Sequence, residues 1–204
     1  MLDEYRLSFG DALDFIVGRI EQALRLKPTQ RRAKTTQSIR LKLGRESIRL
    51  SQMQDIAGCR LIVRDEVQQD GVVQSLQHLF PDAAVVDRRQ RPSYGYRAVH
   101  LIVRQSGKRV EIQVRSFLQD KWAALAEKFS EREPAIKYGA GNQETLRGLE
   151  ALSRLVADYE TLDRTLGGVE KVEMLGPLAQ AREALLHQFR RLWTDQGHPP
   201  RWNE

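Results

Sequence analysis

Apolar side chains recur three and four residues apart along much of the chain, the spacing that places them on one face of a helix. In residues 9–26 this repeat is carried by Leu13, Ile16, Val17, Ile20 and Leu24. Lys27-Pro28 ends the helix, because proline disfavours helical backbone in the residue before it. The same periodicity predicts helices over residues 35–43, 66–80, 117–131 and 143–193. Thr35 or Thr36 is the expected N-cap of the second helix, and the last stretch is expected to be two helices that separate near Gly167-Gly168.

Short segments rich in apolar and β-branched residues lie between these helices and predict buried strands. The strands are expected at residues 57–63, 83–87, 97–105 and 109–115. Ser106-Gly107 joins the last two strands in a hairpin turn. The polar residues 28–34, 89–95 and 137–141 are interpreted as loops. This order predicts an α/β (α+β) chain with a core domain in residues 1–142. Residues 143–204 are expected to form a helical extension that packs on the core or mediates association.

The composition is typical of a protein that folds in water and binds an anion. The chain has 41% hydrophobic residues and a formal net charge of +6. A basic chain suits a nucleotide, an RNA or an acidic surface, although a solvated basic surface gives the same total. No stretch approaches the roughly 20 apolar residues of a membrane span, and the acidic start MLDE argues against a secretory signal. Cys59 is the one cysteine, so no disulfide forms within the chain. We therefore expect a cytoplasmic protein.

Basic residues gather in two stretches of the sequence. The first holds Arg31, Arg32, Lys34, Arg40, Lys42, Arg45 and Arg49, and the second holds Arg88, Arg89, Arg91 and Arg97. On a helix Lys34, Ser38 and Lys42 fall four apart and stack along one face. Two ammonium groups and a hydroxyl at a helix start form a cradle for a polyphosphate, although an ordinary basic surface helix has the same pattern. The sequence contains no GxxxxGK[ST] motif, which excludes a P-loop.

Two carboxylates occupy positions suited to a metal ion. In the strand RVEIQVR (109–115), alternation places Glu111, Gln113 and Arg115 on one face and three apolar residues on the other. Asp55 lies where the chain enters the strand at 57–63. A solvent-facing strand and a turn residue are the simpler readings of these two segments. Together, however, Asp55 and Glu111 fit magnesium, which is usually held by one or two carboxylates, substrate phosphates and water.

An aromatic turn precedes the strand at 97–105. Gly95 between two tyrosines predicts a tight turn that presents a ring, and a ring beside Arg97 is able to stack on a purine base. His100 lies on the strand that follows, where a core histidine bonded to the backbone is the alternative interpretation.

Taken together, these segments resemble the synthetase domain of the RelA/SpoT alarmone synthetases. The resemblance rests on the order RxKxxxSIxxKL, QDIAGxR, GYRxxH and VEIQVR followed by QDxWA, and it covers about residues 30 to 140. It is strongest to the small stand-alone synthetases, and none of the four histidines is followed by Asp, as a His-Asp hydrolase motif requires. It implies a mixed, roughly five-stranded sheet with helices, akin to the nucleotidyltransferases. It also implies a magnesium-dependent transfer of pyrophosphate from ATP to the 3′-hydroxyl of GDP or GTP.

The resemblance also implies a role for each matching position. Arg32 and Arg60 correspond to arginines that hold the adenine of ATP between them. The phosphates of ATP would be contacted by Lys34, Ser38, Lys42 and Arg45. Asp55 corresponds to the magnesium ligand, and Glu111 to a second acid that activates the acceptor hydroxyl and shares the metal. Tyr96 corresponds to the ring that stacks on guanine, and the rest of the acceptor pocket comprises Arg97, His100, Gln113, Arg115 and Asp120.

The acceptor side departs from the family pattern. Many small synthetases carry Asn near the position of Asp120, and Glu-His often follows the Trp-Ala pair, whereas here Ala124 and Leu125 follow it. One alternative is therefore a toxin of the same fold that pyrophosphorylates adenosine nucleotides or the 3′ end of tRNA, with the tRNA backbone held by Arg88, Arg89 and Arg91. The other is a catalytically silent nucleotide- or RNA-binding module. A homo-oligomer or an antitoxin partner at the C-terminal helices is compatible with each alternative.

Overall fold

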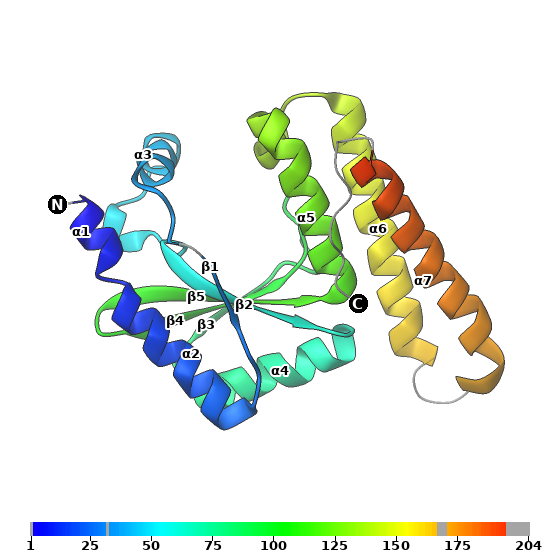
Figure 1. Cartoon of the computed structure of the whole chain (residues 1–204), viewed down its shortest axis with the longest axis horizontal. Coiled ribbons are helices and arrows are strands. Elements are labelled where there is room, and N and C mark those ends of the chain that lie inside the picture. Colours follow the sequence, from blue (N-terminus) through cyan, green and yellow to red (C-terminus); the bar gives the residue numbers. More distant parts are fainter. Residues whose placement is uncertain (1, 32, 167–170, 195–204) are drawn as a thin grey trace. The chain divides into compact units, whose positions relative to one another are not determined.

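The computed structural model describes residues 2–31, 33–166 and 171–194 (Figure 1). Its helices are α1 (Leu2–Leu7), α2 (Gly10–Leu24), α3 (Thr36–Arg45), α4 (Glu66–Leu79), α5 (Phe117–Arg132), α6 (Gln143–Leu166) and α7 (Lys171–Thr194). Two 3-10 turns are η1 (Leu50–Gln52) and η2 (Pro134–Tyr138). The strands are β1 (Thr29–Arg31), β2 (Ala57–Val63), β3 (Ala84–Asp87), β4 (Val99–Gln105) and β5 (Lys108–Ser116). The predicted break near Gly167-Gly168 lies outside the described residues.

The chain forms two compact units that alternate along the sequence. The first comprises residues 1–63, 68–87 and 99–115, and the second comprises residues 64–67, 88–98 and 116–204. The predicted domains, 1–142 and 143–204, are continuous segments, and that division stays a prediction.

The first unit is built on a mixed five-stranded sheet with the order β1-β2-β5-β4-β3, which confirms the predicted fold class. β1 runs antiparallel to β2, and β4 runs antiparallel to both β3 and β5. β1 corrects the sequence prediction, because residues 28–34 were expected to be a loop. Its three residues are polar and carry no periodicity, and the strand exists because Thr29–Arg31 pairs with the edge of β2.

The hydrophobic core of the first unit lies on one face of the sheet, where α2 and α4 pack (Figure 1). Val110, Ile112 and Val114 of β5 are completely buried there, as the alternation of that strand predicts. Burial of each such side chain stabilises the fold by roughly 1.5–3 kcal/mol. The intervening residues of β5 face the other side of the sheet, where the candidate site lies.

The second unit is a helical layer with its own core. Leu118, Trp122, Leu149 and Phe189, from α5, α6 and α7, lie in one apolar cluster. The indole Nε1–H of Trp122 donates to the carbonyl oxygen of Leu149 at 2.8 Å, which satisfies the buried donor. The two long C-terminal helices therefore pack against α5.

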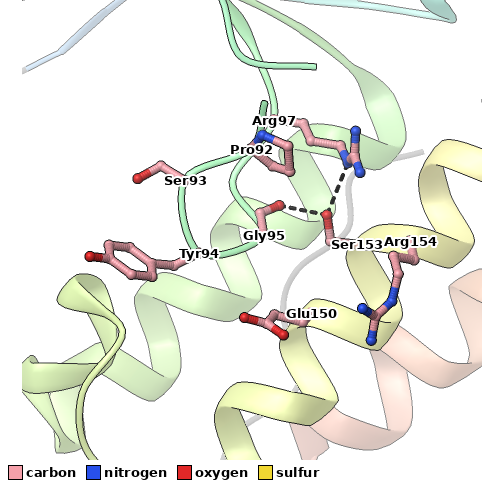
Figure 2. Close-up of a pocket in the computed structure, with 8 residues that line it drawn as sticks. All are labelled: Pro92, Ser93, Tyr94, Gly95, Arg97, Glu150, Ser153 and Arg154. Carbon is pink, nitrogen blue, oxygen red and sulfur yellow. Dashed lines mark hydrogen bonds between the residues drawn. The ribbon is translucent and has the colours of Figure 1, made fainter. Parts of the chain in front are cut away.

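A two-residue turn in the segment 88–98 lies beside Ser153 of α6 (Figure 2). Tyr94 and Gly95 both have positive φ, 52° and 85°, and the amide of Tyr96 donates to the Ser93 carbonyl at 2.9 Å. A Cβ at Gly95 would lie 2.6 Å from a ring carbon of Trp122, so only glycine fits. The hydroxyl of Ser153 on α6 donates to the Gly95 carbonyl oxygen at 2.6 Å and fixes the turn on the helix.

Glu160 of α6 is a buried acid in the second unit, with 4% of its surface exposed. Ser116, the N-cap of α5, donates to one of its carboxyl oxygens, and the amide of Gln119 donates to the other at 3.0 Å. Burial raises the pKa of Glu160 to about 7, and the neighbouring carboxylate of Glu66 adds to the rise against the opposing hydrogen bonds. The folded protein therefore holds a proton that the unfolded chain releases near pH 4.5.

This buried acid predicts that stability falls as the pH rises. Between about pH 5 and pH 7 Glu160 binds more protons in the folded chain than in the unfolded chain, so we expect its titration alone to remove at most about 3 kcal/mol of stability over that range. Glu160→Gln is expected to flatten the dependence, whereas the exposed Glu150→Gln on the same helix leaves it unchanged. Thermal unfolding at pH 5 and pH 8 measures both, and an equal pH slope in Glu160→Gln and wild type would refute the assignment.

Among the described residues, no helix combines the length and the apolar character required to cross a membrane.

Candidate active site

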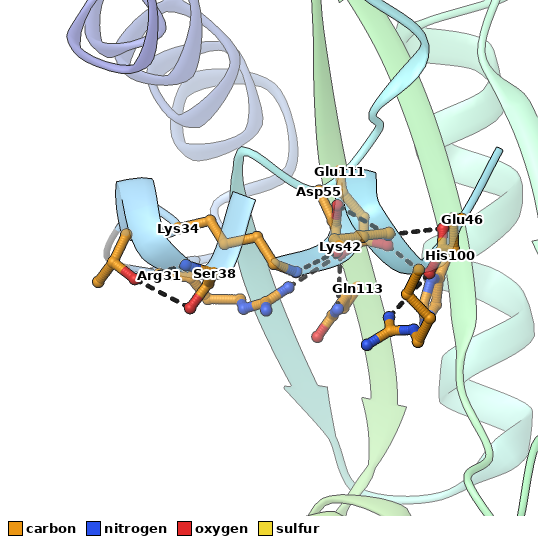
Figure 3. Close-up of polar contacts among 11 residues, drawn as sticks. Arg31, Lys34, Ser38, Lys42, Glu46, Asp55, His100, Glu111 and Gln113 are labelled. Atoms are coloured by element: carbon orange, nitrogen blue, oxygen red, sulfur yellow. Dashed lines mark hydrogen bonds and ion pairs between the residues drawn. The ribbon is translucent and has the colours of Figure 1, made fainter. Parts of the chain in front are cut away.

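The first cluster of the candidate site gathers around Asp55, two residues before β2 (Figure 3). The ammonium groups of Lys34 and Lys42 contact its two carboxylate oxygens at 2.6 and 3.0 Å. Lys42 lies in α3, whereas Lys34 lies two residues before the helix begins, where its backbone amide donates to the Ile56 carbonyl oxygen at 2.9 Å. The predicted stacking of Lys34 on the helix face is therefore corrected. Thr35 caps α3 by accepting from the Ser38 amide at 3.2 Å, which confirms the first of the two predicted N-caps. The two lysines of the predicted phosphate cradle therefore form ion pairs with the Asp55 carboxylate.

The second cluster gathers around Glu111 in the middle of β5 (Figure 3). The imidazole Nδ1 of His100 lies 2.8 Å from one carboxylate oxygen, and the side-chain amide of Gln113 donates to the other at 2.7 Å. Arg115 donates in turn to the Gln113 oxygen at 3.2 Å. His100 is thus bonded to a carboxylate. All four side chains are buried, although each is polar or charged.

Arg31 is the site residue that the sequence did not single out. Its guanidinium contacts Glu111 at 2.9 Å, although the two residues lie on strands that are not neighbours. Gly58 of β2 lies between them: it pairs with Arg31, and a Cβ on it would lie 2.4 Å from the backbone oxygen of Glu111. The missing side chain leaves room for Arg31 to reach across β2. The only sequence signal was the basic cluster to which Arg31 belongs.

Both carboxylates are ionised at neutral pH. Burial by itself would raise the pKa of Asp55, but the hydrogen bonds and positive charges of Lys34 and Lys42 outweigh burial and lower it. For Glu111 burial is again the largest effect, and His100 and Arg31 reverse it, so that the pKa lies below its ordinary value. The protein thus stabilises two negative charges with cations of its own.

The remaining predicted ATP contacts lie outside the two carboxylate clusters. Arg45 at the end of α3 donates to Glu46 at 2.9 Å, and Ser38 accepts from the Thr35 hydroxyl at 2.9 Å. Arg60 lies on β2, half-buried. Arg32 lies outside the described residues. Cys59 is buried in the core, and burial raises the pKa of its thiol to about 12, as expected of an inert thiol.

Three of the predicted acceptor residues belong to the second unit. Tyr96 is half-buried and packs against the apolar cluster of that unit. Arg97 donates from Nε to the Ser153 hydroxyl at 3.0 Å and from a terminal nitrogen to the Arg89 carbonyl oxygen. Asp120 lies in the first turn of α5. The structure thus brings His100, Glu111, Gln113 and Arg115 together in the first unit, and Tyr96, Arg97 and Asp120 belong to the second.

The second unit also contains a pocket of about 610 Å³ next to the aromatic turn (Figure 2). Tyr94, Arg97, Glu150, Ser153 and Arg154 contribute to its wall. Tyr94 rather than Tyr96 exposes its ring here, with 52% of its surface accessible. Gly139 lies against that ring, since a Cβ there would stand 2.2 Å from a ring carbon.

Comparison with known proteins identifies the family. A family model described as a region found in RelA / SpoT proteins matches residues 31–133. Uncharacterized proteins of Mycobacterium tuberculosis and Mycobacterium bovis are 36% identical over 124 residues, which cover 58% of this chain and 44% of theirs. The chain thus spans less than half the length of these curated relatives.

Solved structures agree with this match. Small alarmone synthetase 2 from Bacillus subtilis is similar with a TM-score of 0.59 and 28% identity, covering 83% of this chain and 96% of that one. Small alarmone synthetase 1 from the same organism, bound to its product pppGpp, has a TM-score of 0.65 at 21% identity, covers 82% and 97%, and shows the shared fold. Because the family region matches half of its length and includes both carboxylate clusters, the chain belongs to the RelA/SpoT family.

Proposed function

We propose that this protein is an ATP-dependent pyrophosphokinase that transfers pyrophosphate from ATP to the 3′-hydroxyl of GDP or GTP. The observation that carries the proposal is the pair of ionised carboxylates in one unit. Asp55 is held by two ammonium groups, and Glu111 is held by His100 and Arg31. A site that only bound a polyphosphate would gain nothing from two negative charges directed at it. A site that activates a hydroxyl and binds a metal requires them.

The reaction forms one bond and breaks another at the β-phosphorus of ATP. The acceptor 3′-oxygen bonds to that phosphorus, the bond to the oxygen bridging the α-phosphorus breaks, and AMP leaves. Glu111, ionised and fixed by its neighbours, accepts the proton of the 3′-hydroxyl. Lys34 and Lys42 supply positive charge for the phosphate oxygens, because phosphoryl transfer depends mainly on positioning and charge neutralisation.

Magnesium suits the donors that the site offers. Among the described residues, no group of three or more His, Cys, Asp or Glu side chains gathers to form an all-protein metal site. Asp55 and Glu111 instead provide carboxylate oxygens, the ligands magnesium combines with substrate phosphates and water. We propose Asp55 as the first ligand and Glu111 as the second. The bound ion would neutralise charge on the phosphates during transfer.

A guanosine nucleotide is the proposed acceptor. Support comes from the small alarmone synthetase 1 structure, whose bound product is pppGpp, and from the retained sequence GYRxxH. The buried group of His100, Glu111 and Gln113 provides an imidazole, a carboxylate and an amide next to the place proposed for the 3′-hydroxyl.

The proposal is tested with magnesium and ATP labelled at its β- and γ-phosphates. The purified protein is offered GDP, GTP, ADP, ATP or deacylated tRNA separately. We expect label to move to GDP or GTP. Label that moves only to tRNA, or only to adenosine nucleotides, would keep the chemistry and replace the acceptor. A folded protein that binds ATP and transfers label to none of the five would overturn the proposal.

A further inference from the structure

The first unit also contains a pocket, which lies at the end of the β4–β5 hairpin. It has a volume of about 550 Å³ and is lined by Gln54, Asp82, Ala84, Ile102, Arg104 and Arg109. Gln54 immediately precedes Asp55, so the pocket begins one residue from the first carboxylate cluster. None of these six residues has a role in the site described above.

Two arginines stand directly opposite each other in this pocket. Arg104 of β4 and Arg109 of β5 are partners in the antiparallel register. Partners in such a pair project from the same face of the sheet, and like charges placed this way destabilise it. Arg109 donates to the carbonyl oxygen of Gln52 at 3.1 Å, whereas Arg104 forms no side-chain hydrogen bond or ion pair within the described part of the chain. Asp82 is the one carboxylate of the lining, so the lining has a net positive charge.

The arginine pair shares its sheet face with the catalytic carboxylate. Arg109 and Glu111 are two positions apart on β5 and therefore project from the same face, separated by about 7 Å. Ile102, whose side chain lines the pocket, is the register partner of Glu111. The pocket thus extends from the two arginines to the register partner of Glu111, the residue at which the acceptor 3′-hydroxyl is proposed to react.

We infer that Arg104 and Arg109 bind the 5′-phosphates of the acceptor nucleotide. The inference rests on the proposed function. A nucleotide carries its 3′-hydroxyl and its 5′-phosphates on opposite sides of one ribose, so a hydroxyl at Glu111 leaves the phosphates free to extend along β5. Guanidinium groups bind phosphate oxygens through paired, charge-assisted hydrogen bonds. The pair therefore selects a free nucleoside polyphosphate over a nucleoside, which has no phosphate. It also selects against the 3′ end of an RNA, because the 5′-phosphate of the last nucleotide is a single diester linked to the rest of the chain.

The test compares acceptors that differ only in their 5′-phosphates. KM and kcat are measured for GTP, GDP and guanosine at saturating ATP, with the double variant R104Q/R109Q. R64Q/R147Q is the matched control, because it removes two positive charges that do not line the pocket. We expect R104Q/R109Q to raise KM for GTP and GDP by roughly tenfold or more. The KM for ATP and the rate with guanosine should match those of the control.

Several results would overturn the inference. Unchanged KM values for GTP and GDP would do so, and so would an equal loss for guanosine, which would indicate a structural effect. Transfer of label only to tRNA, at a rate that R104Q/R109Q does not change, would also overturn the inference. If the wild-type protein transfers to no acceptor, the proposed function fails, and GTP binding is then measured by calorimetry. Weaker GTP binding by R104Q/R109Q would still support a phosphate site, whereas GTP binding that is equal to wild type, or undetectable in both, would eliminate it.

Discussion

Replacing Glu111 with Gln is expected to slow pyrophosphate transfer by roughly 10²–10⁴-fold, the range that general-base catalysis supplies. Glutamine keeps the shape of the side chain and much of its hydrogen bonding, but it accepts no proton. It also leaves the Arg31 guanidinium, 2.9 Å away, without its counter-charge. The rate of label transfer from ATP in a single turnover measures the loss directly.

The control for this variant is Glu127→Gln, which neutralises an exposed carboxylate on α5. Thermal unfolding must show that Glu111→Gln is folded, because its site is buried. A folded Glu111→Gln protein that transfers at a rate close to wild type would remove Glu111 from the mechanism and leave positioning by the cations as the main source of catalysis.

The second large effect is expected from Asp55→Asn. The change removes the proposed magnesium ligand, and a metal in this role contributes several kcal/mol, so the rate should fall by on the order of 10³-fold. It also leaves Lys34 and Lys42 facing each other without the carboxylate that both contact. Transfer rates measured over a magnesium titration should show that the variant requires a higher concentration than wild type.

Asp158→Asn, an exposed change on α6, is the matched control for this titration. If Asp55→Asn loses activity but keeps the wild-type magnesium dependence, Asp55 organises the lysines and does not bind the metal. Activity that is close to wild type would eliminate both roles.

Strong periodicity in the sequence predicted most of the fold. β2 begins and ends where its run of apolar residues does, and β5 alternates between a core face and a polar face as its sequence indicates. α2, α4 and α5 lie within one or two residues of their predicted bounds. In these elements the local sequence pattern and the tertiary packing favour the same structure, so the pattern alone predicts the element.

The sequence could not predict features that depend on distant partners. β1 has only three residues, and pairing with β2 alone makes it a strand. The contact of Arg31 with Glu111 requires Gly58 to lie between them, which appears only when β1, β2 and β5 are placed in order. The sequence also could not decide which tyrosine of the aromatic turn is exposed. That depends on the positive φ of Tyr94 and on the packing of Trp122 against Gly95.

The position of Glu111 is set by a neighbour that has no side chain. Because the backbone of β5 lies against Gly58, any atom added there would displace the carboxylate itself, whatever substrate the protein uses. We therefore expect variation in this chain to be unequally tolerated. The paired middle of β2 and β5 should accept almost no change without losing the chemistry. The hairpin end at Arg104 and Arg109 should accept changes that alter acceptor affinity and leave the transfer step intact. New acceptor preferences would then arise at the hairpin end of β4 and β5, while the reaction at Glu111 remains the same.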